Sequence, residues 1–273
     1  MRIRVCIVTM TPELAYDAAN RAVDMADGPV EVLLASNCCK LDAARFHSCV
    51  RLGIFESEDN DGVVPQMHRL WEEARKTPAS LVDARDDILV YIHDDCQILE
   101  KGWDGRVISI MSTQPACDAI GFVGGTGIGA ADIYQSPYAM IQLGRHNVHS
   151  NLVDAESHGA RATGPMLLAT ADGCALILRR SFLDEMGGWS SWWPEPNHGY
   201  DNALACELRR RGRQLWLLPV RFAHPSPLKF TTPPNIVGSQ RYVARFGTDQ
   251  EVHARAHQRL YDTYRDVLPF HVS

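Results

Sequence analysis

The chain has 273 residues, of which 45% are hydrophobic, and its 27 Lys and Arg against 33 Asp and Glu give a formal net charge of −6. This length and apolar content suffice to bury a substantial core, which excludes a disordered or fibrous protein. The acidic balance gives no sign of a nucleic-acid or anionic-membrane partner, although it does not exclude local basic patches. No apolar run approaches the roughly 20 residues that span a bilayer, and the start of the chain is too weakly apolar for a secretory signal. We therefore expect a soluble, cytoplasmic protein.

The eight cysteines are scattered along the chain, with one adjacent pair, Cys38 and Cys39, and no C-x-x-C spacing. This pattern argues against both a zinc cage and a disulfide framework. We expect most of them to be reduced and to serve as small core residues.

The first hundred residues alternate strand-like and helix-like segments, which is typical of a parallel β-α-β sheet. Thr11 and Pro12 mark the start of the first helix, because proline is favoured in the first helical turn. Ligands of open α/β sheets bind beyond the carboxyl ends of the strands, so the ends of these strands are candidate sites. The expected elements are a strand over 3–10, a helix over 12–26, strands over 30–36 and 48–57, a helix over 63–76 and a strand over 86–95.

The pattern changes after residue 100. A stretch as irregular and as long as 126–163 is usually functional when it lies inside a compact domain. We predict one domain over 1–230, with halves 1–100 and 101–230, followed by a helical tail over 231–273. The expected elements are a helix over 102–114, a strand over 118–125, a strand, turn, strand and short helix within 166–188, a helix over 199–212, a strand over 213–227 and one or two amphipathic helices over 239–267.

The segment YIHDDCQIL, residues 91–99, places the adjacent carboxylates of Asp94 and Asp95 at the end of a predicted strand. Like charges so close repel each other unless a cation or hydrogen-bond donors neutralise them. Mg²⁺ binds one or two protein carboxylates together with phosphate oxygens, and Mn²⁺ also suits oxygen ligands. The alternative is that one aspartate caps the following turn and the other is solvated, and the spacing alone leaves both interpretations open.

Two further residues are candidates for chemistry. Asp201 lies near the first turn of a predicted helix, where a carboxylate is either a capping residue or a general base within reach of a substrate proton. His224 ends a late strand in RFAHPS. It is either a structural histidine or, if the strands are parallel and it faces the same rim as Asp94 and Asp95, a further ligand for Mn²⁺.

The segment GTGIGA, residues 125–130, matches the loose form of a dinucleotide-binding fingerprint. Such a motif needs a helix that begins on it and an acidic residue about 20 positions further on. Pro137 interrupts the helix that would follow, and the first strand-to-helix turn, VTMTPE, contains no glycine. A nicotinamide-dependent oxidoreductase is therefore the less favoured alternative. The nearby His146, His149 and His158 are more typical of a solvated or acceptor-contacting loop than of a metal site.

Taken in order, these segments resemble glycosyltransferase family 2, and in particular its small, divergent bacterial and phage branch. The resemblance covers residues 3–227 and implies a GT-A type, Rossmann-like α/β fold with a central, mostly parallel sheet flanked by helices. It also implies an inverting, metal-dependent enzyme that moves a sugar from a UDP- or GDP-sugar to an acceptor hydroxyl. The Q-x-x-R-W motif of processive synthases is absent, so a single addition is expected. The segments are VYIHDDCQIL, IGFVGG, ADGCALILRRSF, GGW, HGYDNALACELRRRG and FAHPSP.

The resemblance assigns roles by position. Asp95 and His224 would hold Mn²⁺ or Mg²⁺, Asp94 would contact the ribose or sugar, and Asp201 would be the catalytic base. The acceptor is open among a glycan, a lipid-linked sugar, a protein, a small molecule and modified DNA. A non-catalytic nucleotide-sugar-binding module is the alternative from another class. The remaining donor contacts would be Thr9, Glu13 and Asn37 for the nucleobase and ribose, and Asp172 and Gly173 beside the donor sugar or acceptor.

Overall fold

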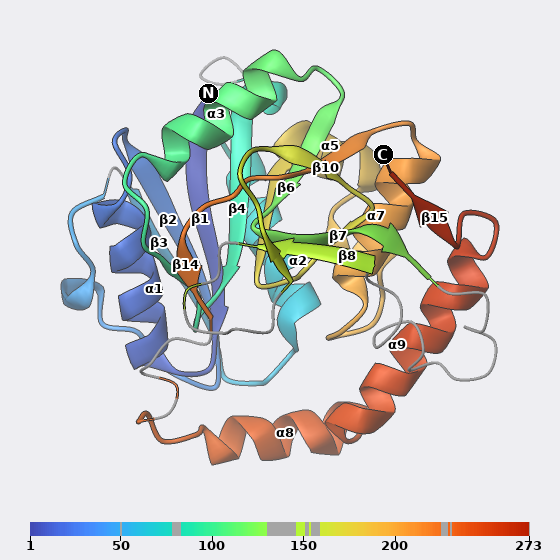
Figure 1. Cartoon of the computed structure of the whole chain (residues 1–273). Helices are drawn as coiled ribbons and strands as arrows, with labels where there is room; N and C mark the ends of the chain where they lie inside the picture. Colours follow the sequence, from blue (N-terminus) through green and yellow to red (C-terminus); the bar gives the residue numbers. More distant parts are fainter. Residues whose placement is uncertain are drawn as a thin grey trace.

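A computed structural model of the chain shows an α/β architecture in which helices cover a central sheet (Figure 1). The predicted α/β class is confirmed. The residues that the structure describes are 1–49, 51–77, 83–129, 146–150, 153, 159–224, 229 and 231–272.

The central sheet has eight strands in the order β10-β13-β6-β12-β4-β1-β2-β3. Its first half is parallel, because β1 pairs in parallel with both β2 and β4, and β2 with β3. Strand β12 enters antiparallel between β4 and β6. All eight residues of β2 are buried, as expected for a strand with helices on both faces. The strands are β1 (Arg2–Thr9), β2 (Val30–Asn37), β3 (Arg51–Ser57), β4 (Asp87–His93), β6 (Cys117–Gly121), β10 (Met166–Leu168), β12 (Ala175–Arg179) and β13 (Gln214–Leu217).

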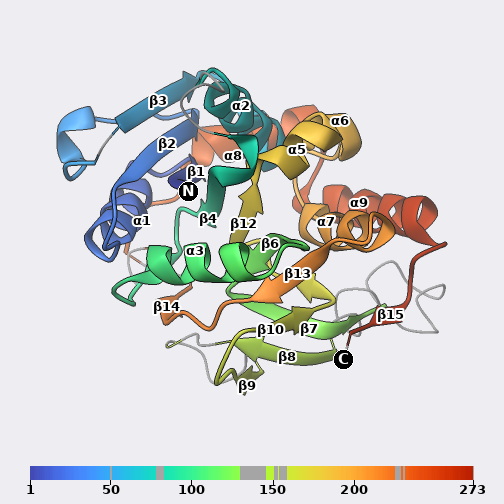
Figure 2. The same cartoon turned by 90° about the horizontal axis from the view of Figure 1, so that it is seen from above.

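Helices lie on both faces of this sheet and build two hydrophobic cores, as Figure 2 shows from above. One core packs α1 and α3 against the sheet. The other core contains α2, α5, α6 and α7, with the fully buried Trp189 between them. The apolar periodicity that predicted α1, α2, α3 and α7 therefore reflects real buried faces. The elements are α1 (Pro12–Asp24), η1 (Ala43–Arg45), α2 (Val63–Arg75), η2 (Ala84–Asp86), α3 (Trp103–Thr113), α5 (Arg180–Met186), α6 (Trp189–Trp192) and α7 (Tyr200–Arg210).

A second, five-stranded sheet and a short two-stranded one complete the fold. The single strands expected over 118–125 and 213–227 are wrong, because each segment bends and continues in another sheet: β6 gives way to β7 at Phe122, and β13 to β14 beyond Leu217. The added strands are β5 (Gln97–Ile98), β7 (Val123–Ile128), β8 (His146–Ser150), β9 (Ala160–Arg161), β11 (Thr170–Ala171), β14 (Phe222–Ala223) and β15 (Phe270–His271).

The described part of 126–163 is not irregular, because it contains the last residues of β7 and the whole of β8 and β9. These strands are short or glycine-rich, which hides their alternation. In place of the turn and helix that a dinucleotide fingerprint requires, 125–128 belongs to β7 and pairs with β8, β11 and β15. The residues 130–145 and 154–158, with His158, lie outside the described part of the chain.

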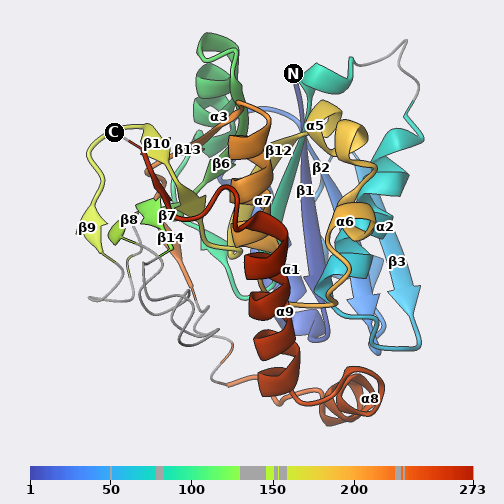
Figure 3. The ribbon, with the colours of Figure 1, turned by 90° about the vertical axis from the view of Figure 1, so that its right-hand side faces the viewer.

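Where one or two helices were expected, the tail forms two, α8 (Ile236–Phe246) and α9 (Asp249–Tyr264), as Figure 3 shows. A capping box between Thr248 and Glu251 starts α9. Leu260 and Tyr264 of α9 belong to the same core as α7. The division of the chain at residue 230 stays a prediction. Within the residues described, no helix combines the length and the apolar composition that crossing a bilayer requires.

Candidate active site

Three ligand-type side chains converge where β4 ends. His93 is the last residue of β4, and Asp95 lies in the turn that follows. Strand β14 pairs antiparallel with β5 and so brings His224, the next residue after β14, beside this turn. The Nε2 atom of His224 lies 3.2 Å from Oδ1 of Asp95, and Nδ1 of His93 lies 4.0 Å from the same oxygen.

This cluster fits a divalent cation. One ligand atom from each of His93, Asp95 and His224 lies within 4.8 Å of the others. A carboxylate oxygen and two imidazole nitrogens form a donor set that suits Mn²⁺. Asp95 is buried and the two histidines are half-buried, so the set faces into the protein. We call these three residues the cation corner.

The environments of His93 and Asp95 favour the protonation states that a metal ligand needs, whereas that of His224 favours its protonated form while no cation is bound. Burial and the neighbouring His224 lower the pKa of His93, which keeps this imidazole neutral. Burial by itself would lower the pKa of His224, but its hydrogen bond to Asp95 and the charge of that carboxylate outweigh burial and raise the pKa. Burial would raise the pKa of Asp95, yet hydrogen bonds from His224 and Lys229 hold that pKa well below its usual range. Asp95 is therefore ionised, as a metal ligand must be.

Asp94 has the opposite environment from its neighbour. Burial raises its pKa to about 6, and the negative charge of Asp95 raises it further, while the hydrogen bond from Thr9 works in the opposite direction. The Oγ1 of Thr9 donates a hydrogen bond of 2.6 Å to Oδ2 of Asp94. Below about pH 6 the protonated form of Asp94 therefore limits the repulsion between the two adjacent carboxylates.

A second group of residues lies at the start of α7. Oδ2 of Asp201 accepts a hydrogen bond of 3.2 Å from the N–H of Gly173, and Oδ1 accepts one of 2.8 Å from the N–H of Asn202. Gly173 belongs to the turn between β11 and β12, which Asp172 stabilises by accepting a 3.0 Å bond from the N–H of Cys174. These backbone donors orient the Asp201 carboxylate. We call Asp172, Gly173 and Asp201 the base corner.

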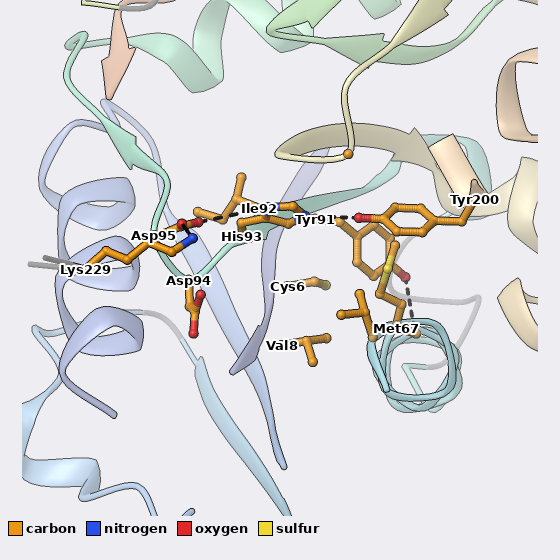
Figure 4. Close-up of a pocket in the computed structure, with 12 residues that line it drawn as sticks. Cys6, Val8, Met67, Tyr91, Ile92, His93, Asp94, Asp95, Tyr200 and Lys229 are labelled. Carbon is orange, nitrogen blue, oxygen red and sulfur yellow. Dashed lines mark hydrogen bonds and ion pairs between the residues drawn. The ribbon is translucent and has the colours of Figure 1, made fainter. Parts of the chain in front are cut away.

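Tyr200 and His93 connect the two corners. The hydroxyl of Tyr200 lies 3.0 Å from Nε2 of His93, while Nδ1 of the same ring faces Asp95. Tyr200 directly precedes Asp201 in α7, and Figure 4 shows its ring beside His93. His93 of the cation corner therefore contacts Tyr200, the residue that directly precedes Asp201 of the base corner.

Two adjoining cavities open at this edge of the sheet. The smaller, of about 180 Å³, lies between the two corners and has an apolar floor of Cys6, Val8 and Met67 (Figure 4). The larger, of about 720 Å³, extends over the ends of β1 and β2 to α8. The larger cavity has room for a molecule of the size of a nucleoside, and the smaller one for a single six-membered ring.

The residues predicted for the donor divide between these cavities and the surface. Thr9 and Asn37 line the larger cavity, and Asp94 lines both. Glu13 does not border either cavity in the described part of the chain, since it lies on the exposed side of α1 and pairs with Arg45 at 2.9 Å. The functional roles of these residues stay predictions.

Three residues of the site were not assigned from the sequence: His93, Tyr200 and Lys229. His93 stands in the same HDD motif as the aspartates, so the motif itself was the available signal. Tyr200 precedes the predicted base, but no periodicity distinguishes it from a core aromatic residue. Lys229 follows two prolines in a segment without periodicity, and nothing local indicates that it reaches Asp95.

No protein-family model matches the chain, and no curated protein matches it in sequence. Solved structures do resemble it. GalNAc-T7, solved with UDP, GalNAc and Mn²⁺, has a TM-score of 0.52 and 13% identity over 97% of this chain and 50% of that chain. S. aureus TarS 1-349 has a TM-score of 0.54 and 13% identity over 98% of this chain and 74% of that chain. The same TarS fragment in complex with UDP gives a TM-score of 0.50 and 11% identity.

These likenesses define the class of fold. The chain has the GT-A fold of glycosyltransferases, which confirms the fold that the sequence resemblance predicted. It spans about half the length of the GalNAc-T7 chain.

Proposed function

We propose that the protein is a metal-dependent, inverting glycosyltransferase that moves one sugar from a UDP- or GDP-sugar to an acceptor hydroxyl. The observation that carries this proposal is that one cavity at the edge of the sheet is lined by His93 and Asp95 of the cation corner and by Gly173, whose N–H binds Asp201. The UDP and Mn²⁺ named for structures of the same fold support it.

In this proposal the chain's residues divide the work between donor and acceptor. Asp95, His224 and His93 hold Mn²⁺ or Mg²⁺, which when bound offsets the charge that builds on the leaving diphosphate. The larger cavity takes the nucleoside, with Thr9 and Asn37 among its lining residues. The smaller cavity takes the donor sugar, with Gly173 at its wall.

Asp201 acts as the general base. The acceptor oxygen forms a bond to the anomeric carbon from the face opposite the diphosphate, and the bond from that carbon to the phosphate oxygen breaks with its electron pair on the leaving group. Asp201 takes the proton of the acceptor hydroxyl. Hydrogen bonds from the backbone N–H groups of Gly173 and Asn202 help to fix the direction of this carboxylate. The sugar carbon is inverted.

The test pairs binding with turnover. Thermal shifts with UDP- and GDP-sugars, with and without Mn²⁺, identify the donor, because a ligand that binds the folded state raises its stability. Asp201→Asn is expected to keep metal-dependent donor binding and to lower transfer by a factor of about 10² to 10⁴. Asp95→Ala is expected to abolish metal-dependent binding. Asp262→Asn, at an exposed position of α9, is the matched control.

The outcomes separate the candidate functions. Full transfer by Asp201→Asn would exclude Asp201 as the base. Metal-dependent binding of a nucleotide sugar without release of nucleoside diphosphate, across all acceptor classes, would point to the non-catalytic binding module. Absence of binding for every UDP- and GDP-sugar would contradict the proposal as a whole.

A further inference from the structure

The carboxylate of Asp95 has a partner besides the two histidines. The ammonium of Lys229 pairs with Oδ2 of Asp95, as the dashed line in Figure 4 marks. The Lys229 side chain is 56% exposed, whereas that of Asp95 is 4% exposed. A flexible cation thus reaches from the solvent side to the buried carboxylate of the cation corner.

This contact conflicts with a metal ion at the same carboxylate. His224 and His93 face Oδ1 of Asp95, and Lys229 takes the other oxygen. A divalent cation held by Asp95 would lie close to the ammonium, and two cations on one buried carboxylate repel each other. Lys229 therefore weakens binding of a metal that arrives alone.

Lys229 also lies at the boundary between the two cavities. Four of the described residues border both of them, Val8, Val63, Asp94 and Lys229, and Lys229 is the cation among the four. In a nucleotide sugar the diphosphate joins the nucleoside to the sugar. With the nucleoside in the larger cavity and the sugar in the smaller one, the diphosphate passes this boundary. An ammonium group there is a natural phosphate partner.

We propose that Lys229 exchanges partners during donor binding: it neutralises Asp95 in the free protein and moves to the diphosphate when metal and nucleotide are both bound. The proposal rests on the proposed function, because it assumes a nucleotide diphosphate and a metal at this site. Its consequence is cooperative binding. The nucleotide removes the competitor of the metal, so each ligand strengthens the binding of the other.

The experiment measures binding without turnover. Lys229→Met removes the charge and keeps much of the length of the side chain, Lys229→Arg keeps the charge, and Lys76→Met at a surface pair with Glu73 is the matched control. Mn²⁺ affinity is followed by electron paramagnetic resonance without nucleotide. UDP and GDP affinities are followed by calorimetry with Mn²⁺ present.

Lys229→Met is expected to bind Mn²⁺ alone about threefold or more tightly than the wild type and to bind the preferred nucleotide with Mn²⁺ about tenfold or more weakly. Lys229→Arg and Lys76→Met are expected to stay within about twofold of the wild type in nucleotide affinity. These effects have opposite signs, which loss of folding would not produce.

Unchanged or weaker Mn²⁺ binding by Lys229→Met would overturn the competition at Asp95. Unchanged nucleotide affinity would overturn the contact with the diphosphate. Either result leaves the proposed function intact as long as the wild type binds Mn²⁺ and nucleotide together. A wild-type protein that binds neither would instead contradict the proposed function and, with it, this inference.

Discussion

Replacing Gly173 by alanine tests how closely the base corner is packed. A Cβ atom at this position would lie 2.5 Å from the hydroxyl oxygen of Tyr200 and 2.9 Å from its Cζ atom. The backbone of Gly173 does not have a positive φ, so the substitution adds no conformational strain of its own. The Tyr200 ring is 7% exposed and packs against Trp189, with ring centroids 5.9 Å apart. The ring therefore has little room to retreat, and a shift that relieves the overlap disturbs its hydrogen bond with His93.

The magnitude follows from these two effects. Overpacking of a buried position costs about 1 to 3 kcal/mol. Loss of the hydrogen bond between His93 and Tyr200 adds about 1 kcal/mol. For a chain of this size, in which 1 kcal/mol shifts Tm by about 2 °C, the sum of about 2 to 4 kcal/mol corresponds to a fall in Tm of roughly 4 to 8 °C. Since Gly173 donates its N–H to Asp201, we also expect kcat of transfer to fall by about tenfold or more.

The assay is thermal denaturation together with nucleoside diphosphate release. Gly105→Ala is the control, because its Cβ would meet no atom within 4 Å and it lies inside helix α3. Alanine there should raise stability by about 0.5 to 1 kcal/mol. In a Tyr200→Phe background, where the closest atom is removed, Gly173→Ala should cost less than in the wild type. A Tm of Gly173→Ala equal to that of the wild type would refute the packing argument.

Three further substitutions have defined outcomes. Asp94→Asn should stabilise the ligand-free protein near pH 8 but not near pH 4. The pKa of Asp94 is about 6 in the folded state, so its contribution to stability is fully present below about pH 3.8 and is lost as the pH rises through about 6. The gain in the free energy of unfolding at pH 8 is at most about 3 kcal/mol. Equal pH profiles of Tm for both proteins would count against this environment. Arg4→Met removes one of the positive charges that pair with the buried carboxylate of Asp87, and it should lower the free energy of unfolding in urea by about 3 kcal/mol. A loss below about 1 kcal/mol would show that this ion pair is dispensable. Thr248→Ala removes the capping box with Glu251 and should cost about 1 kcal/mol in the same urea titration, with no change if the end of the helix frays in solution.

The sequence predicted the N-terminal half of the fold well, because β1, β2 and β4 are rich in apolar residues and α1 begins at the expected Pro12. The prediction was wrong where one continuous apolar segment forms two strands that belong to different sheets. Phe122 stands between β6 and β7 and is fully buried, so nothing in the local alternation marks the bend. The fold of the second sheet depends on strand pairs that are distant in sequence, which periodicity does not reveal.

The candidate site shows the same division. The motif HDD and the end of the late strand pointed to Asp95 and His224 separately, and their meeting was expected from parallel strands. The structure brings them together differently, since it is the antiparallel pair of β5 and β14 that places His224 beside Asp95. Glu13 was assigned by position in the resemblance, but its place on the helix surface depends on the turn of α1 and its ion pair with Arg45. Lys229 gave no signal, because its contact joins two residues that lie 134 positions apart in the sequence.

The pairing of β15 with β7 has a consequence for how the protein is made. Phe270 lies opposite Ile128, so β7 leaves the ribosome long before its neighbour on that side exists. The strands β1 to β4 can pair as they emerge, whereas the sheet that carries β7 keeps an open edge until β15 is synthesised. We therefore expect ribosome-bound nascent chains that end before β15 to resist proteases over β1 to β4 and to be cleaved in the β7 region.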